Sequence, residues 1–361
     1  MNVLQAEAIH PQTDGRDIDE SVAELIGEAA HQEAGPVEDH LARIAQTWQT
    51  LPEPDASDPT YYDRPMLKEP VWKGFIPAYY FVGGLSGATF ALGAAAQLDR
   101  SGALDALVRR CHRVGVIGSS ISAALLIADL GRPERFLYML RVFRPTSPMN
   151  MGAWILAGAP SAAITAALFA RAKPGLFRWI GEAAGYTSGV LGVALATYTG
   201  VLVGTSAIPV WQESRCVLPL LFGASAAASA GALMGAIFQD RRAAKVTRVF
   251  GIAGMAAELA STYAMEKRVA EVPRVGRPLK KGLSGALWKL ASALTAAGLI
   301  TSLLPRQTRK KRIVAGALAG AGSLMLRFAV QQAGVASARD PRAAFHQQRA
   351  GHGGSALERT G

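Results

Sequence analysis

The chain has 361 residues, of which 50% are hydrophobic, and carries a formal net charge of +11 with a mean hydropathy of +0.18. The charge is unevenly divided, because residues 1–70 hold 15 acidic and 4 basic side chains while the remainder is strongly basic. The basic residues fall mainly in short loops between long apolar runs. That distribution is typical of membrane proteins and argues against nucleic-acid binding.

The cysteines and histidines limit which redox centres the chain could hold. Cys111 and Cys216 lack CxxC spacing and fall in different predicted loops, so they predict neither cluster ligation nor a disulfide. Of the six histidines only His112 lies near a predicted span, whereas a two-haem subunit needs paired axial ligands within its helices. The sequence therefore predicts no haem, iron–sulfur cluster or metal in this chain.

Residues 1–70 form an acidic N-terminal extension that we expect to be partly helical or disordered. Two weakly amphipathic stretches would each share one helical face: Val22, Leu25, Ile26 and Ala29 in the first, then Leu41, Ile44 and Trp48 in the second. Residues 51–70 are rich in proline and aspartate, which is typical of a linker. Docking of a partner protein is one role open to this extension.

Residues 71–335 contain eight long apolar blocks, and crossing the hydrocarbon core of a membrane takes about 20 such residues as a helix. The blocks lack the alternation of barrel strands, so helices are the structure that satisfies their backbone groups in lipid. We therefore predict an all-α integral membrane protein, a bundle of eight transmembrane helices. The expected spans are 74–98, 114–130, 150–171, 183–208, 217–238, 249–266, 283–304 and 312–333.

The loop charges suggest an orientation for this bundle. Loops after the odd-numbered spans hold 16 lysines and arginines, and loops after the even-numbered spans hold 11. The positive-inside rule then places the odd loops in the cytoplasm and both termini outside, although the acidic extension argues for the opposite orientation. The polar tail, residues 336–361, is expected to be disordered.

Two loops are candidate surfaces for a partner protein. The longer one, residues 129–150, combines aromatic residues with four arginines and three prolines, a mixture that suits protein interfaces. The shorter one covers residues 208–215. The residues expected to contact the partner are Arg132, Arg135, Pro148 and Trp211. A loop that is merely well structured would show the same features.

Ionisable residues within the predicted spans are expensive in lipid unless they are paired or face a wet cavity. Glu258 lies inside the sixth span, Arg327 inside the eighth, and Asp129 at the end of the second. These three residues are candidates for a proton path. The alternative is a structural ion pair between helices.

Polar aromatic residues form a third set of candidates. Tyr79 and Tyr80 lie early in the first span, and Tyr198 with Thr199 lies in the last third of the fourth. A phenol at these positions could donate a hydrogen bond to a quinone carbonyl while its ring packs against the head group. An aromatic belt at the membrane interface is the alternative explanation.

Several passages resemble the membrane subunits of the polysulfide reductase family, the NrfD type. The strongest are residues 129–136, Asp-Leu-Gly-Arg-Pro-Glu-Arg-Phe, and residues 147–156, which begin Ser-Pro-Met-Asn-Met-Gly-Ala-Trp. Weaker matches occur at residues 79–85, 198–202, 209–211 and 218–222, and at Arg327 with Gly334. The resemblance covers roughly residues 72–334, and the Ser-Pro-Met motif is its most specific part.

The resemblance implies a cofactor-free, eight-span subunit that binds a quinone, menaquinone or ubiquinone, near the face where an iron–sulfur subunit docks. That subunit would join a catalytic subunit, often a molybdopterin enzyme. Tyr198 looks like the family's quinone-contacting tyrosine, and Asp129 matches an acidic position linked to proton movement. Some relatives place Asn and His in the first span, where this chain has Phe75, Tyr79 and Tyr80.

The sequence thus favours a quinone-binding subunit of a respiratory oxidoreductase in a prokaryotic plasma membrane, inactive without its partners and possessing no catalytic residue of its own. Two other functions remain open. Glu258, Arg327 and many glycines would suit a secondary transporter or proton channel, although such a protein needs broken helices at a midplane site. A scaffold that anchors an enzyme without binding quinone is the second.

Overall fold

The computed structural model describes residues 18–19, 24–25, 67–72, 74–130, 132–237, 240–306 and 308–349. The chain divides into two units, Met1–Pro59 and Thr60–Gly361. In the first unit, strand β1 (Ile18–Asp19) pairs antiparallel with β2 (Glu24–Leu25), with Ile18 opposite Leu25. Leu25, expected on a helical face, is therefore in a strand. The other predictions for residues 1–66 lie outside the described residues.

Eight long helices make up most of the second unit. They are α2 (Phe75–Gln97), α3 (Asp105–Asp129), α5 (Pro148–Phe169), α6 (Leu176–Gly204), α8 (Leu218–Ala236), α9 (Arg241–Ala270), α11 (Gly282–Leu303) and α12 (Arg309–Ala338). Each corresponds to one predicted span, with ends that differ by a few residues, so the all-helical membrane fold is confirmed. Side chains cap three of the N-termini, because Ser147, Asp240 and Thr308 accept hydrogen bonds from backbone amides three residues on.

Seven of these helices are long and apolar enough to cross a membrane. The eighth, α9, holds the predicted sixth span in its middle, but arginines and lysines occupy both its ends and Glu258 its centre, which lowers its hydropathy. Four of the helices, α3, α6, α9 and α12, also extend beyond the predicted spans into charged sequence. Cys111, expected in a loop, is consequently buried in α3, which begins at Asp105.

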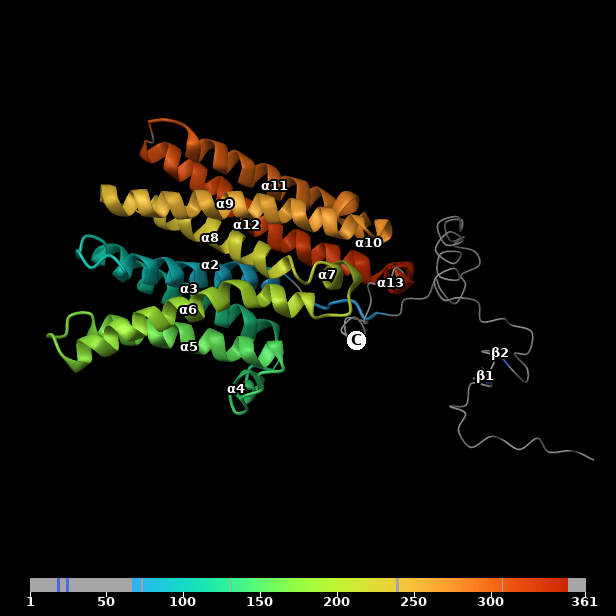
Figure 1. Cartoon of the computed structure of the whole chain (residues 1–361), viewed down its shortest axis with the longest axis horizontal. Helices are drawn as coiled ribbons and strands as arrows, with labels where there is room; N and C mark the ends of the chain where they lie inside the picture. Colours follow the sequence, from blue (N-terminus) through green and yellow to red (C-terminus); the bar gives the residue numbers. More distant parts are fainter. Residues whose placement is uncertain are drawn as a thin grey trace, which may run out of the picture. The chain divides into compact units, whose positions relative to one another are not determined.

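Long helices that follow one another along the chain run antiparallel, and the eight form two groups (Figure 1). The first half comprises α2, α3, α5 and α6, and the second comprises α8, α9, α11 and α12, with α8 also packing against α2 and α6. Glycine allows the closest approaches: a Cβ atom on Gly87 of α2 would overlap the backbone oxygen of Gly192 of α6. We call the end where α2, α5, α8 and α11 begin the proximal end, and the opposite end the distal end.

Short helices gather at the proximal end. They are α4 (Arg135–Met139), α7 (Pro209–Glu213), α10 (Pro273–Lys280) and α13 (Pro341–Arg349). Three of them begin with proline, whose fixed φ suits the first helical position.

The C-terminal segment differs from the expected disordered tail. Residues 336–338 complete α12, and α13 follows. The ion pair between Arg274 and Asp340 (2.9 Å) holds this turn, and Gln347 donates hydrogen bonds to the Pro209 carbonyl and to Glu213. Polar sequence alone suggests a solvated tail, but these side chains find partners on α7 and α10. Residues 350–361 lie outside the described residues.

Candidate functional site

A cavity of about 600 Å³ opens at the proximal end of the first half. Residues from α2, α3, α5 and α6 line it, together with Met139 of α4 and Trp72 just before α2. The lining residues are Trp72, Ile76, Tyr79, Tyr80, Leu126, Asp129, Leu130, Met139, Met149, Ala153, Tyr198 and Leu202. The wall is therefore largely apolar and aromatic, with a few polar groups, as in small-molecule binding sites.

Three of the four tyrosine and threonine candidates meet in this cavity. Tyr79 and Tyr80 come from the start of α2, and their ring centroids lie 5.5 Å apart, while Tyr198 comes from the end of α6. None of the three hydroxyls has a hydrogen-bond partner among the described residues. They are therefore available to a ligand. Thr199 is buried but does not line the cavity, and its hydroxyl also lacks a partner in the described part of the chain.

Tyr198 owes its position to a glycine on the neighbouring helix. A Cβ atom on Gly152 of α5 would overlap the Tyr198 ring, so the absence of a side chain there lets the ring lie against the helix backbone. Gly152 belongs to the Ser-Pro-Met motif, which gives that motif a packing role next to the cavity.

Asn150 organises the loop that leads into α5, a role that sequence reasoning missed. Its Nδ2 donates to the carbonyls of Met139 (2.6 Å) and Val142 (2.9 Å), and its Oδ1 accepts from the Arg144 amide (2.7 Å). The side chain thereby closes the loop over the N-terminus of α5. This loop places Met139 and Met149 on the cavity wall. An asparagine that follows Ser-Pro at a helix start was the available signal.

Among the described lining residues, Asp129 is the one carboxylate, and it is the last residue of α3. It is half-buried and forms no hydrogen bond or ion pair within the described residues. Among the described residues that line the cavity there is no arginine, lysine or histidine. Within that set, Asp129 and the tyrosines are the groups that can exchange a proton with a ligand.

Glu258 and Arg327, the other two proton-path candidates, lie elsewhere, in the core of the second half. Glu258 is 2% exposed and accepts hydrogen bonds from Thr295 of α11 (2.8 Å) and Ser323 of α12 (2.9 Å). Arg327 is 1% exposed, donates to the Phe222 carbonyl (2.8 Å), and lies 3.7 Å from the centre of the Phe222 ring. Glu258 and Arg327 form no direct ion pair.

Arg327 lies between that core and the cavity. Its Nε and Nη1 atoms are buried without hydrogen-bond partners in the described part of the chain, as are both side-chain polar atoms of Gln331, one helical turn further on. The ring of Phe222, beneath the guanidinium, lies 6.0 Å from the ring of Tyr80, which lines the cavity. A single aromatic pair therefore separates the buried arginine from the cavity.

The four partner-docking candidates lie at the proximal end, in a loop, in short helices and at the start of α5. Arg132 is exposed beyond α3, Arg135 begins α4, and Pro148 is half-buried at the start of α5. Trp211, by contrast, is 1% exposed, so its side chain packs inside the protein.

The Trp211 side chain joins α7 to α12. Its Nε1 donates to the Val330 carbonyl (2.8 Å), and its ring occupies space that a Cβ atom on Gly334 would fill. It also stacks on Trp72, at 6.1 Å between ring centroids.

A helical bundle with an aromatic cavity at one end and buried charges in its core defines a multi-pass membrane subunit. The model of the family described as polysulphide reductase, NrfD, matches residues 64–337, and the chain belongs to this family. The family consists of quinone-associated membrane subunits of respiratory oxidoreductase complexes. No curated protein matches the chain.

Proposed function

We propose that the chain is the quinone-reactive subunit of a respiratory oxidoreductase and that the proximal cavity binds the quinone head group. The observation that carries this proposal is the convergence of three unpaired tyrosine hydroxyls and one carboxylate, from three helices, on a single apolar cavity. The cavity is lined mainly by apolar and aromatic side chains with a few polar groups, which is typical of small-molecule sites. The bound species would be menaquinone or ubiquinone.

The cavity residues match what quinone chemistry demands. Reducing a quinone to a quinol takes two electrons and two protons, and the reverse reaction releases them. Tyr198 would donate a hydrogen bond to one carbonyl and orient the ring, while Tyr79 and Tyr80 pack against it. Asp129 would transfer protons between the ligand and the proximal surface, where α3 ends.

The electrons would come from or go to a partner with an iron–sulfur cluster, docked at the proximal end. The loop after α3 offers exposed arginines, such as Arg132, beside exposed apolar side chains. Leu137, Tyr138 and Phe143 are 64%, 57% and 59% exposed. Arginines beside aromatics suit a protein interface. The partner would connect the cavity to a catalytic subunit, a molybdopterin enzyme, in a prokaryotic plasma membrane.

The buried cluster in the second half would carry protons further. Water molecules bound to the unpartnered atoms of Arg327 and Gln331 would satisfy them and extend a polar track from Tyr80 toward Glu258. In this scheme Arg327 and Glu258 act away from the quinone, and the reaction at the cavity does not require them.

Tyr198→Phe in the assembled complex tests the quinone site, because it removes the hydroxyl but keeps the ring on Gly152. We expect the KM for quinone to rise about tenfold, equivalent to about 1.4 kcal/mol of lost binding. Tyr263→Phe, on an exposed tyrosine of α9, is the matched control and should leave quinone turnover unchanged. Unchanged turnover in Tyr198→Phe would instead support a scaffold.

The isolated chain offers a second test. After purification in mild detergent it should retain quinone, and Tyr198→Phe should retain less. Substrate flux across liposomes that contain this chain alone would support a transporter and count against the proposal.

A further inference from the structure

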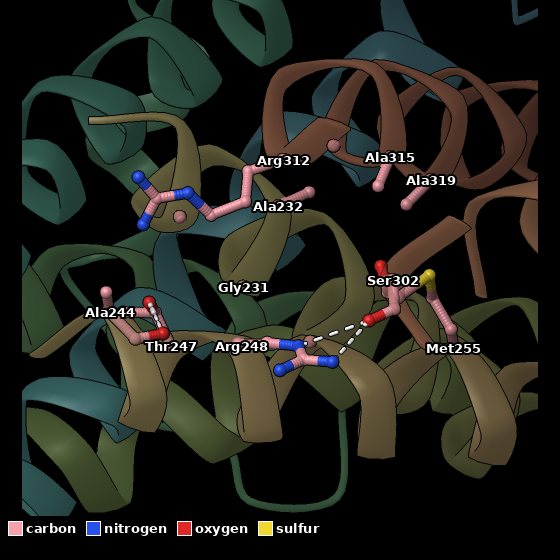
Figure 2. Close-up of a pocket in the computed structure, with 13 residues that line it drawn as sticks. Gly231, Ala232, Ala244, Thr247, Arg248, Met255, Ser302, Arg312, Ala315 and Ala319 are labelled. Carbon is pink, nitrogen blue, oxygen red and sulfur yellow. Dashed lines mark hydrogen bonds between the residues drawn. The ribbon is translucent and has the colours of Figure 1, made fainter. Parts of the chain in front are cut away.

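A second cavity lies at the distal end of the second half (Figure 2). The free space in it, including the part open to solvent, is about 430 Å³, and its described lining residues differ from those of the proximal cavity. Residues of α8, α9, α11 and α12 form its wall, and most of them are glycine or alanine. Among the described residues that line it, Arg248 and Arg312 are the charged ones, and none is acidic.

Arg248 is held in place by the end of a neighbouring helix. Its Nε and Nη2 donate to the Ser302 carbonyl of α11, at 3.1 and 2.7 Å, as the dashed lines in Figure 2 mark. The remaining nitrogen, Nη1, makes no hydrogen bond to any described residue. The guanidinium is therefore fixed in orientation and keeps donor capacity for a ligand.

Arg312 approaches the same cavity from the first turn of α12. Its Nε is buried and has no hydrogen-bond partner within residues 74–349 as described. A buried donor without a partner costs about 1–3 kcal/mol. Two guanidinium groups in one cavity, without a carboxylate to balance them, call for an anion.

The position of the cavity indicates what kind of anion. α9 and α12 both begin at the distal end, so their positive dipole ends add to the two arginines. The wall then continues into the bundle through Met255, Ala315 and Ala319, which are apolar. Basic cavities between transmembrane helices bind lipid head groups, and guanidinium groups bind phosphate through paired hydrogen bonds.

We propose that the distal cavity binds the phosphate of an anionic phospholipid. Arg248 and Arg312 bind the phosphate oxygens, and the apolar wall accommodates the glycerol and the first carbons of the acyl chains. The lipid holds α8, α9 and α12 together at the membrane interface. This site is independent of the quinone site and lies at the other end of the bundle.

The test uses the full chain, purified and delipidated in a neutral detergent, with the thermal unfolding midpoint as readout. Phosphatidylglycerol should raise the midpoint in a saturable manner, and phosphatidylcholine should not. Arg248→Gln and Arg312→Gln should each raise the half-saturating concentration about fivefold, the equivalent of about 1 kcal/mol per basic side chain. Arg309→Gln, three residues before Arg312 and outside the cavity wall, is the matched control and should bind like wild type.

A cavity-filling variant keeps the test independent of charge. Gly235 lines the cavity near the end of α8, and a Cβ atom there would meet no atom within 4 Å. Gly235→Leu should therefore fold with an undiminished midpoint in lipid-free detergent, yet lose the response to phosphatidylglycerol.

Two outcomes would overturn the proposal. Inorganic phosphate that protects as well as phosphatidylglycerol would assign the site to a free anion. If Arg309→Gln weakens phosphatidylglycerol binding as much as Arg248→Gln and Arg312→Gln do, the lipid is attracted by the general positive charge of the distal surface and not by this cavity.

Discussion

The two halves of the bundle treat polar groups in opposite ways. In the first half, Tyr79, Tyr80, Tyr198 and Asp129 surround an open cavity at the proximal end and have no partners among the described residues. In the second half, Glu258 lies deep among helices and has two hydroxyl donors of its own. Unpaired polar groups beside an open space suit the binding of a ligand, whereas a paired, enclosed carboxylate stabilises a structure or relays charge within it.

Glycine placement produces this difference. In the second half, a Cβ atom on Gly231 would overlap the backbone of Gly251, and one on Gly254 would overlap the backbone of Ala228, so α8 and α9 touch along their length. In the first half, Gly152 receives a tyrosine ring instead of a backbone. Close backbone contact brings α8 and α9 together in the second half, whereas the Tyr198 ring that lies on Gly152 forms part of the wall of the proximal cavity in the first half.

The largest expected effect comes from breaking the enclosed cluster. Glu258→Leu would leave the Thr295 and Ser323 hydroxyls without their acceptor and Arg327 without a nearby negative charge. Each buried hydroxyl that loses its acceptor costs about 1–3 kcal/mol, and two are affected at once. Thermal unfolding in detergent should show this loss, and Glu271→Leu, at an exposed position beyond α9, should lower stability far less. Equal losses in the two variants would mean that the cluster does not hold the second half together.

The second-largest expected effect tests the contact between Gly152 and the Tyr198 ring in the first half. Gly152→Ala would push the Tyr198 ring from its place against α5, and overpacking of this kind costs about 1–3 kcal/mol. Alanine favours the helix over glycine by about 1 kcal/mol, so quinone binding should suffer more than stability. Quinone retained after purification is the measurement. Gly158→Ala, two turns along α5 where the nearest atom is the end of Leu191, is the control and should retain quinone normally.

A third prediction concerns the contact between α7, which connects the two halves, and α12 of the second half. Trp211→Phe removes the hydrogen bond to the Val330 carbonyl and leaves that carbonyl buried, at an expected cost of about 1–2 kcal/mol. Trp179→Phe, at an exposed tryptophan of α6, should cost almost nothing. Chemical unfolding monitored by circular dichroism compares the two. Similar losses in both variants would argue against a specific link between α7 and α12.

The sequence predicted the parts of this arrangement that depend on chain order and hydropathy. Tyr79 lies near the start of the first span, and Asp129 and Tyr198 lie near the ends of the second and fourth, so the alternating direction of successive spans brings all three to the same end of the bundle. The high free-energy cost of placing an ionisable side chain in lipid likewise identified Glu258 and Arg327 as residues of interest from the sequence alone.

The remaining features depend on packing that no local pattern encodes. The sequence around Trp211 predicts an interface residue in a loop. Its ring is buried because Gly334, more than 100 positions away, has no side chain and leaves room for it. Arg248 and Arg312 look like ordinary loop charges until four helix ends meet around them. The hydrogen bonds of Asn150 could not be predicted without knowing the path of the preceding loop. The position of α13 likewise depends on contacts with α7 and α10 that its own sequence does not indicate.

The smallest expected effect tests the other link between the halves. Glu69, just before α2, pairs with Arg339, just after α12, at 2.9 Å, and this hydrogen bond lowers the pKa of Glu69. Because the folded-state pKa lies below the unfolded value, the pair contributes stability above the unfolded pKa and loses it as pH falls through the folded pKa. Both side chains are largely exposed, so the contribution is small and screened by salt. Unfolding midpoints of wild type and Glu69→Gln should differ slightly at neutral pH in low salt and converge in acid or at high salt. A difference that persists in acid would mean that the pair acts through packing and not through charge.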